Sequence, residues 1–304
     1  MKISVKGRLF GGIFVALLAA FTAYALLDVF VIPHTYAAVE AQPSGAVTDQ
    51  AASSGSVAEA PAGAATDAYS DENITITLTE YREHDTTIYV ADVTLSSPEY
   101  LKTALASDVY GRNIKADTSE IAAAHNAILA INGDFYGARN SGYVIRGGTL
   151  YRDRSGGNED LVVYADGSFG IISEDEITAA ELLESGAVEV LSFGPGLVES
   201  GEITVSENDE VGRAMASNPR TAIGIIDENR YLFVVSDGRT ESSEGLTLYQ
   251  LAEFMRKLGA KTAYNLDGGG SSTMFFNGEV VNNPTTGGNR VDERSVSDIV
   301  YIGY

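Results

Sequence analysis

The sequence predicts an α+β protein: a single domain with a large mixed or antiparallel sheet and packed helices, preceded by an N-terminal transmembrane helix and a flexible stalk. Three observations lead to this prediction. Short apolar runs, several of them with a two-residue period, recur between turn signals from residue 74 to the C-terminus. Only a few segments between these runs have helical spacing or helix caps. A long uncharged stretch stands near the N-terminus.

The N-terminal stretch has the pattern of a membrane anchor. Residues 9–27 carry no charge, and apolar residues resume at 29–32 after Asp28. This length is enough to cross a bilayer, and basic residues before it predict that the N-terminus stays inside. Residues 1–37 are therefore assigned as a cytoplasmic tip and anchor of a single-pass protein of the cell membrane, with an extracytoplasmic C-terminal domain. A cleaved signal peptide and a secreted protein remain the alternative, because residues 35–37 form an acceptable cleavage site.

A stalk and one folded domain follow. Residues 38–72 are rich in Ala, Ser, Gly and Pro and have few large apolar side chains. Such a segment cannot bury enough surface to offset its chain entropy, so it is predicted to be disordered. Residues 73–304 are predicted to form the domain, and its strands are expected at 74–79, 87–95, 127–131, 161–164, 169–172, 188–193, 221–226, 231–235, 260–264, 273–276 and 297–302.

Four helices are expected in the domain, at 98–106, 119–126, 178–185 and 248–258. The last has the clearest signals. Thr247 and Gln250 form a capping box, and Gly259 stands where a C-terminal glycine is expected. Its apolar residues fall on one face, so the helix is expected to pack against a sheet.

Composition excludes several functions. The 304 residues include 42 acidic and 20 basic ones, a net charge of −22, which argues against a nucleic-acid-binding or anionic-membrane surface. Cysteine is absent, which excludes disulfides and thiolate-ligated metals. With only three histidines, acid–base chemistry is expected to depend on carboxylates.

The stretch at residues 265–272, Asn-Leu-Asp-Gly-Gly-Gly-Ser-Ser, is the strongest candidate site. It follows one predicted strand and precedes another. Consecutive glycines allow close approach of a ligand, and their free N–H groups can form an anion-binding nest. Asp267 would place an acid, base, nucleophile or metal ligand at the mouth of that nest. A tight turn capped by an aspartate is the alternative.

Three other loops share the pattern of small and polar residues after an apolar strand, at 132–134, 194–196 and 236–239. If the sheet brings the four loops together, Asp134, Asp237 and Asp267 would share a cleft. Paired carboxylates perform glycosidic chemistry or bind Mg²⁺ or Ca²⁺. Taken singly, each Asp-Gly is more often an ordinary turn, because Asp and Gly are turn formers.

Two arginines are candidates for phosphate recognition. A guanidinium can bind phosphate through two parallel hydrogen bonds. Arg220 precedes a predicted strand, and Arg294 lies near the C-terminus. An isolated arginine at a strand start is more often a solvated charge.

Together these motifs resemble the phosphodiester glycosidase family, which includes N-acetylglucosamine-1-phosphodiester α-N-acetylglucosaminidase and many bacterial proteins linked to exopolysaccharide. The resemblance begins near Ala127 and extends to the C-terminus. The sequence departs from the family pattern at two positions. Asp134 stands at a position that resembles glycine in the animal enzyme. Glu293 precedes Arg294, so this segment matches the arginine-containing C-terminal segment of the family only loosely. The segments that carry the resemblance are 131–136, 193–198, 218–224, 236–239, 245–254 and 265–272.

The resemblance implies hydrolysis of a sugar-1-phosphodiester on the sugar side of the phosphate. It assigns the catalytic carboxylates to Asp267, Asp237 and Asp134. Substrate and phosphate binding is assigned to Asn132, Gly133, Gly194, Arg220, Thr221, Gly268, Gly269, Gly270, Ser271, Ser272 and Arg294. The expected partners are a sugar-phosphate diester or phosphate-containing glycan, and the membrane through the N-terminal helix, without nucleic acid. No cofactor is assigned, and a divalent cation, Ca²⁺ or Mg²⁺, is left open.

Three functions follow as hypotheses. The first is an extracytoplasmic glycosidase acting on sugar-1-phosphodiester bonds of an envelope glycan or exopolysaccharide. The second is a non-catalytic protein that binds a glycan or phosphate polymer during envelope assembly. The third is a metal-dependent phosphodiesterase that cleaves the P–O bond.

Overall fold

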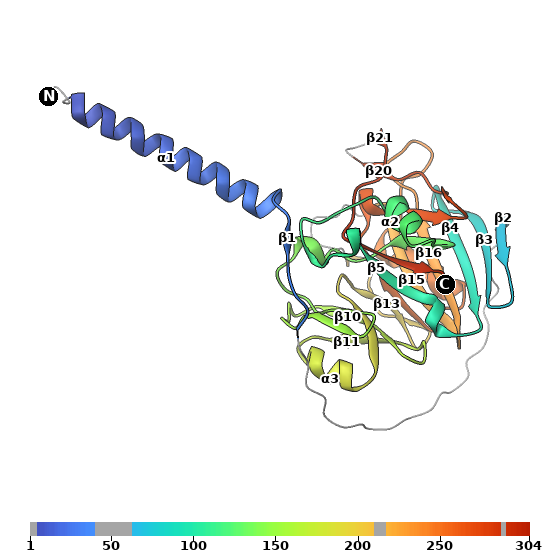
Figure 1. Ribbon diagram of the computed structural model, residues 1–304. Coiled ribbons are helices and arrows are strands. Elements are labelled where there is room, and N and C mark those ends of the chain that lie inside the picture. The colour runs from blue at the N-terminus through green and yellow to red at the C-terminus, as the bar shows by residue number, and fades with distance from the viewer. Residues whose placement is uncertain (1–4, 40–62, 210–216, 287–289) are drawn as a thin grey trace.

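The computed structural model describes residues 5–39, 63–209, 217–286 and 290–304 of the chain. Helix α1 (Val5–Phe30) projects away from the folded domain (Figure 1). Residues Ile13–Phe30 are long and apolar enough to cross a membrane, and none of them is buried. The predicted apolar N-terminal helix is therefore confirmed.

Most of the domain consists of antiparallel strands, arranged in three sheets. The largest has eight strands and contains the two longest strands of the domain. In spatial order its strands are β14 (Glu202–Ile203), β13 (Gly196–Glu199), β17 (Thr262–Asn265), β15 (Arg220–Asp227), β16 (Arg230–Ser236), β4 (Thr86–Leu95), β3 (Ile74–Glu83) and β2 (Ala64–Ser70).

Two five-stranded sheets complete the fold. The first contains β19 (Glu279–Val280), β18 (Met274–Phe276), β7 (Leu129–Asn132), β22 (Asp298–Ile302) and β5 (Leu101–Leu105). The second contains β11 (Phe169–Ser173), β10 (Glu159–Tyr164), β12 (Ala187–Leu191), β8 (Val144–Arg146) and β9 (Thr149–Arg152). Two short ribbons pair β1 (His34–Thr35) with β6 (Gly111–Arg112) and β20 (Thr285–Thr286) with β21 (Arg290–Val291).

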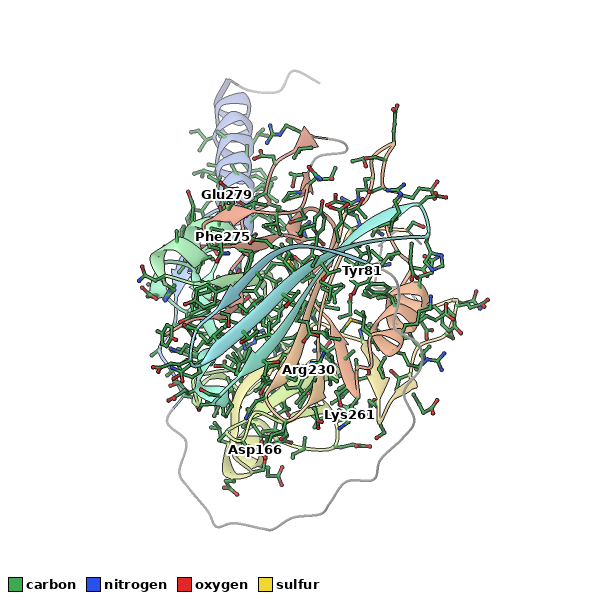
Figure 2. All side chains as sticks on the ribbon, turned by 90° about the vertical axis from the view of Figure 1, so that its right-hand side faces the viewer. Tyr81, Asp166, Arg230, Lys261, Phe275 and Glu279 are labelled. Carbon is green, nitrogen blue, oxygen red and sulfur yellow. The ribbon has the colours of Figure 1, made fainter. Side chains whose placement is uncertain are left out.

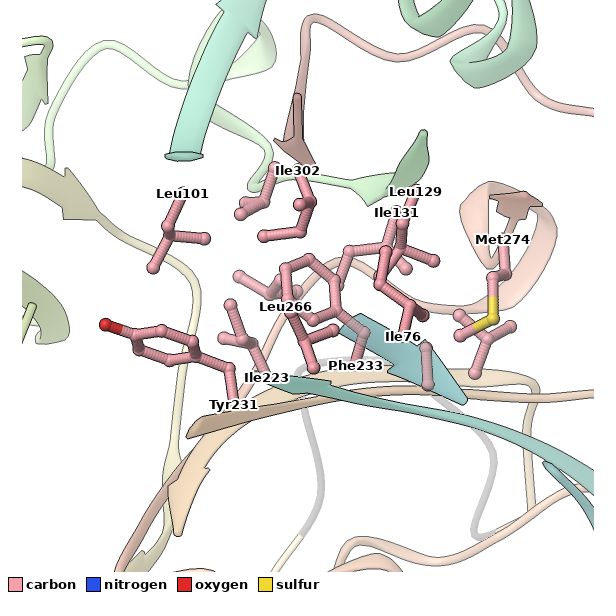
Figure 3. Packing of buried hydrophobic residues seen from close by; sticks show 14 of the residues in the cluster. Ile76, Leu101, Leu129, Ile131, Ile223, Tyr231, Phe233, Leu266, Met274 and Ile302 are labelled. Atoms are coloured by element: carbon pink, nitrogen blue, oxygen red, sulfur yellow. The ribbon is translucent and has the colours of Figure 1, made fainter. Parts of the chain in front are cut away.

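The main core lies between the eight-stranded sheet and the sheet that contains β7. Figure 3 shows Leu129, Ile131 and Ile302 facing Ile223 and Phe233 of the larger sheet. All five side chains are fully buried. Burial of aliphatic and aromatic side chains on this scale is the main stabilising contribution to such a fold.

Each helix of the domain covers an outer face of a sheet. Helix α4 (Leu248–Lys257) packs its apolar face on the large sheet, and Figure 2 shows Tyr81 of β3 beside it. The rings of Tyr81 and Phe254 lie 5.4 Å apart at their centroids. The Thr247–Gln250 capping box is present, as predicted. Helix α2 (Thr118–Ala124) covers the sheet of β7, and α3 (Ala179–Glu184) covers the sheet of β10.

The segment at 98–106 does not form the predicted helix. Only the 3₁₀ turn η1 (Pro98–Tyr100) and the first residue of the turn η2 (Ala106–Asp108) are helical, and β5 lies between them. Strand β5 pairs with β22 along its whole length, from Leu101 opposite Ile302 to Leu105 opposite Asp298. Tertiary pairing at the sheet edge therefore outweighs the local helical pattern.

The predicted stalk is also partly structured. Ala64–Ser70 forms edge strand β2, paired antiparallel with β3. Residues 33–39 lie against the domain, where Tyr36 N–H donates to the Tyr110 carbonyl at 3.1 Å and Val39 N–H to the Leu150 carbonyl at 2.7 Å. Disorder is therefore wrong for 64–70, and residues 40–62 lie outside the described residues.

Candidate active site

The large sheet brings two of the candidate loops and Arg220 to the same end of its strands. Strand β15 runs antiparallel to β16 and β17, so that Arg220 lies opposite Ser236 and Ala222 opposite Asn265. The start of β15 therefore meets the ends of both neighbours, which lead into Asp237 and Asp267. The sequence analysis gave this convergence only as a condition, and antiparallel pairing accounts for it.

The glycines after Asp267 allow the loop to pack tightly against its neighbours. A Cβ atom at Gly268 would lie 2.9 Å from the Pro219 carbonyl oxygen, and one at Gly270 2.6 Å from Thr286 Oγ1. Gly269 has a φ of 64°, and a Cβ atom at this position would stand 2.9 Å from Arg239 Nη2. No larger residue fits these positions without displacing a neighbour.

The predicted nest of free N–H groups is largely closed. The Gly269 N–H donates to the Pro219 carbonyl at 2.8 Å, and the Ser271 and Ser272 N–H groups donate within the 3₁₀ turn η4 (Gly269–Ser271). Three of the five amides between 268 and 272 thus have protein acceptors. Anion recognition at this loop has to come chiefly from the arginines around it.

Asp267 is nearly buried, with 7 % of its surface exposed. One carboxylate oxygen accepts hydrogen bonds from Ser271 Oγ at 2.7 Å and from Arg294 Nη2 at 2.9 Å. Burial raises the pKa of the Asp267 carboxyl, although the Arg294 charge and these hydrogen bonds oppose the shift. The carboxyl is thereby suited to exchange a proton closer to neutral pH than an ordinary aspartate.

Arg294 connects the carboxylate to the glycine loop. Its Nε donates to Ser271 Oγ at 2.8 Å, and its Nη2 also donates to the Gly268 carbonyl at 2.9 Å. The Arg294 side chain remains 44 % exposed, so part of the guanidinium is open to a ligand.

Two further arginines lie beside the same loop. Arg220 is buried, and its Nε donates to the Leu246 carbonyl at 2.8 Å. A Cβ at Gly268 would come within 4.0 Å of Arg220 Cδ. Arg239 is held by Asn218, whose Oδ1 accepts from its Nη2 at 2.8 Å. Burial and the neighbouring Arg294 charge lower the pKa of Arg239, which indicates a concentration of positive charge.

Arg239 was missed by the sequence analysis. Its signal was available, because it directly follows Ser236-Asp237-Gly238 in one of the four loops. A positive φ of 62° turns its side chain over Gly269.

Asp237 is buried but has different partners from Asp267. Its oxygens accept from the Asn283 N–H at 2.8 Å, from Asn283 Nδ2 at 2.9 Å and from Asn282 Nδ2 at 3.4 Å. Asn282 also donates to the Ser272 carbonyl at 2.9 Å, which links Asp237 to the glycine loop. Burial raises the pKa of Asp237 despite these amide donors.

Asp134 is directed away from Asp267, into a buried ion cluster. Its oxygens accept from Arg146 Nη2 at 2.9 Å, from the Ser192 N–H at 2.9 Å and from the Tyr136 N–H at 2.8 Å. Arg146 also binds Asp298 at 2.7 Å. These contacts favour a structural role for Asp134 over the predicted acid–base role.

Neighbours of Asp134 in the sequence also have structural partners. Gly133 leaves no room for a side chain, because its Cβ would stand 2.4 Å from Asp298 Oδ1. Asn132 Nδ2 donates to the Asp267 carbonyl at 2.6 Å, and its Oδ1 accepts from Thr221 Oγ1 at 2.8 Å. Asn132 and Thr221 thus position the backbone of Asp267.

Gly194 contacts the last residue of β17, Asn265. Its carbonyl accepts from Asn265 Nδ2 at 2.8 Å, and a cis peptide joins it to Pro195. Gly194 lines a cleft of about 440 Å³ together with Phe193 and Glu159, and Asp267 is not among the lining residues.

The described residues do not fit a metal site. Within residues 5–39, 63–209, 217–286 and 290–304, no group of three or more histidine, aspartate or glutamate side chains could hold an ion. Asp267 is paired with a guanidinium, and Asp237 accepts from amide donors. One oxygen of Asp267 and both oxygens of Asp237 thus already accept hydrogen bonds from the protein.

Comparison with known proteins agrees with the family resemblance and the fold. A family model for phosphodiester glycosidases matches residues 125–303. The human N-acetylglucosamine-1-phosphodiester α-N-acetylglucosaminidase is 31% identical over 191 residues, 56% of this chain and 36% of that protein. The SPbeta prophage-derived uncharacterized protein YomE of Bacillus subtilis is 29% identical over 206 residues, 65% of this chain and 31% of that protein.

The chain thus spans about a third of the length of these two relatives. A solved structure, the catalytic domain of zebrafish N-acetylglucosamine-1-phosphodiester α-N-acetylglucosaminidase auto-inhibited by its pro-peptide, shares the fold. It has a TM-score of 0.61 and 21% identity, and the match covers 80% of this chain and 88% of that one.

Proposed function

Because this chain belongs to the phosphodiester glycosidase family, we propose that it hydrolyses sugar-1-phosphodiesters between the anomeric carbon and the phosphate oxygen. The observation that carries the proposal is the contact of Asp267, Ser271 and Arg294, with two more arginines beside the glycine loop. A carboxylate and a group of guanidiniums supply what this reaction needs, a base at the sugar and positive charge at the phosphate.

Hydrolysis starts at Asp267. The ionised carboxylate takes a proton from a water molecule, and the water oxygen bonds to the anomeric carbon. The bond between that carbon and the phosphate oxygen breaks, and its electron pair leaves with a phosphate monoester. The products are a free sugar and the aglycone bearing the phosphate.

The leaving group explains why arginines outnumber acids at the site. A phosphate monoester is a weak base, so its departure needs charge stabilisation more than protonation. Arg294, Arg239 and Arg220 supply three positive charges beside Gly268–Gly270. Preorganised charge of this kind is among the largest contributions to enzymatic rate enhancement.

The other predicted residues receive different roles. Asn132 and Thr221 hold the Asp267 backbone. The Asp237 carboxyl, with its raised pKa, is proposed to hydrogen-bond a sugar hydroxyl beside the loop. Gly194 and its cleft are proposed to accept a neighbouring part of the substrate.

We place the activity outside the cytoplasm, on a glycan of the envelope or an exopolysaccharide. Helix α1 has the length and composition of a signal anchor or a signal peptide. Docking of residues 33–39 on the domain supports the uncleaved anchor, because cleavage after Ala37 would release Tyr36 from Tyr110. Immunoblotting for a size change between precursor and mature protein tests this choice.

The activity is tested with isotope-labelled water. The full chain is incubated with UDP-N-acetylglucosamine and a panel of sugar-1-phosphodiesters in ¹⁸O water, with Asp267→Asn as the inactive control. Label in the free sugar supports cleavage of the C–O bond. Label in the phosphate would establish a phosphodiesterase instead, and saturable binding without turnover on the panel would favour the binding-protein hypothesis.

A further inference from the structure

A second cleft, separate from Asp267, is lined by arginine and tyrosine side chains. We call it the arginine–tyrosine cleft and define it by Arg112, Arg139, Arg152, Arg154, Tyr36 and Tyr151. Its volume is about 410 Å³, within the range of small-ligand sites. It lies where the C-terminal end of α1 meets the domain, since Arg112 Nη2 donates to the Asp28 and Val29 carbonyls at 3.1 and 2.8 Å.

The charge of the cleft is unusual for this chain. The protein has a net charge of −22, yet the cleft is lined by four arginines and by no aspartate or glutamate. Among the described residues, Arg146, Arg230, Arg290 and Arg294 form ion pairs with carboxylates, and the four arginines of the cleft form none. Four positive charges therefore face one cavity without a counter-charge from the protein.

Backbone carbonyls hold three of these arginines in place without neutralising them. Arg112 Nη2 donates to the Val29 carbonyl at 2.8 Å, and Arg139 Nη1 donates to the Ser192 carbonyl at 3.1 Å. Arg152 donates from Nε to the Gly142 carbonyl at 2.6 Å and from Nη1 to the Arg139 carbonyl at 2.7 Å. Three guanidinium groups are therefore held in position before a ligand binds.

Aromatic rings form the other wall. Tyr110 lies at the centre, with ring centroids 5.3 Å from Tyr136, 4.9 Å from Tyr151 and 6.0 Å from Tyr36. Tyr36 is 52 % exposed. Aromatic faces provide rigid apolar contact area, and their hydroxyls provide polar contacts at low entropic cost.

We propose that the arginine–tyrosine cleft binds a phosphorylated saccharide, with the arginines on the phosphate and the tyrosines on the sugar ring. Guanidinium groups match phosphate oxygens in geometry and charge. The tyrosine rings add contact area for a sugar ring, which favours a saccharide phosphate over phosphate alone. The cleft is a binding site additional to the proposed hydrolytic one and does not depend on it.

Arg154 is the residue to change, because its side chain is exposed and forms no hydrogen bond or ion pair with another described residue. Arg154→Gln in the full chain, held in phosphatidylcholine nanodiscs, is titrated calorimetrically with N-acetylglucosamine 1-phosphate. We expect about tenfold weaker binding, since a hydrogen bond to a charged group is lost. Arg256→Gln is the matched control, an exposed arginine on α4 outside the cleft, and its affinity should equal that of the unchanged protein.

Three comparisons keep the test specific. Repeating the titrations in an Arg294→Gln background weakens phosphate binding at the proposed hydrolytic site, and the tenfold difference should persist. Tyr36→Ala should weaken the sugar phosphate more than inorganic phosphate, because only the former has a ring. Equal affinity of Arg154→Gln and the unchanged protein would overturn the proposal. So would Arg154-dependent binding to phosphatidylglycerol vesicles without sugar-phosphate binding, because it would assign the cleft to the membrane.

Discussion

Two aspartate–arginine pairs of this protein show how surroundings decide what the same chemical groups do. In the first, Arg146 and Asp134 are 4 and 0 % exposed at their side chains, and Asp298 completes the cluster. In the second, Arg294 is 44 % exposed and Asp267 10 %. A fully buried pair has all its donors used by the protein, whereas a half-exposed guanidinium can also bind a ligand. The first pair therefore stabilises the fold, and the second is suited to binding a ligand and to exchanging a proton with it.

The largest expected effect separates the two aspartates by activity. Asp267→Asn removes the proposed base and should lower kcat/KM about 10²–10⁴-fold, because a positioned acid or base contributes that much. Its thermal midpoint should stay within a few degrees of the unchanged protein, because Asn can still accept from Ser271 and Arg294. Steady-state kinetics and thermal unfolding measure both quantities. Asp134→Asn is the matched control, and unchanged hydrolysis in Asp267→Asn would remove Asp267 from the mechanism.

The second prediction concerns the stability of the buried cluster. Arg146→Met leaves Asp134 and Asp298 buried without a counter-charge, and should lower the free energy of unfolding by about 3–5 kcal/mol. Arg230→Met removes an exposed pair with Asp92, at the surface in Figure 2, and should cost at most about 1 kcal/mol. Urea unfolding measures both. If the two variants lost equal stability, burial would not be what distinguishes the two regions.

The third prediction tests Arg294 through pH. Asp267 must be ionised to act as a base, so kcat/KM should rise as pH rises through its pKa, which burial raises. Arg294 favours the ionised form, so Arg294→Gln should move the acidic limb of the pH profile to higher pH. It should also lower kcat/KM about tenfold or more through the lost charge–phosphate contact. An unshifted acidic limb would mean that Arg294 does not act on Asp267.

The sequence predicted elements whose signals are local. Helix α4 was predicted from the Thr247–Gln250 capping box, and strands β15 and β16 from the apolar runs at 221–226 and 231–235. The apolar N-terminal helix and the family were also predicted correctly. The 98–106 segment failed because pairing with β22, almost two hundred residues away, determines its structure.

The candidate site shows the same division between local and distant information. Asp267 and its glycine loop stand out in the sequence, and antiparallel pairing explains why Arg220 and Asp237 approach the same edge. The partners of Asp134 could not be predicted, because Arg146 and Asp298 come from different sheets and no local pattern joins them. The closed nest was likewise missed, since the acceptor for Gly269 is the distant Pro219.

A buried carboxyl without a guanidinium gives the last and smallest prediction. Asp160 is fully buried beside Glu174, and burial followed by the Glu174 charge raises its pKa to about 9. For Glu174, burial alone would raise the pKa, but N–H donors from Asn158, Gly156 and Tyr143 lower it. Asp160 therefore takes the proton and Glu174 the charge. In the other cluster, burial and the Asp134 charge raise the pKa of Asp298 to about 8, although the shared Arg146 charge opposes the shift.

This difference determines how stability depends on pH. The folded protein keeps the Asp160 proton that the unfolded chain releases above its ordinary pKa near 4. The stabilising contribution is therefore complete below about pH 4 and is lost as pH rises toward 9. Asp160→Asn is neutral throughout, so its free energy of unfolding should fall less between pH 5 and 9, which urea titrations at several pH values measure. Parallel pH dependences in the two proteins would show that Asp160 is ionised in the fold, and that a buried carboxylate here can be tolerated without a cation.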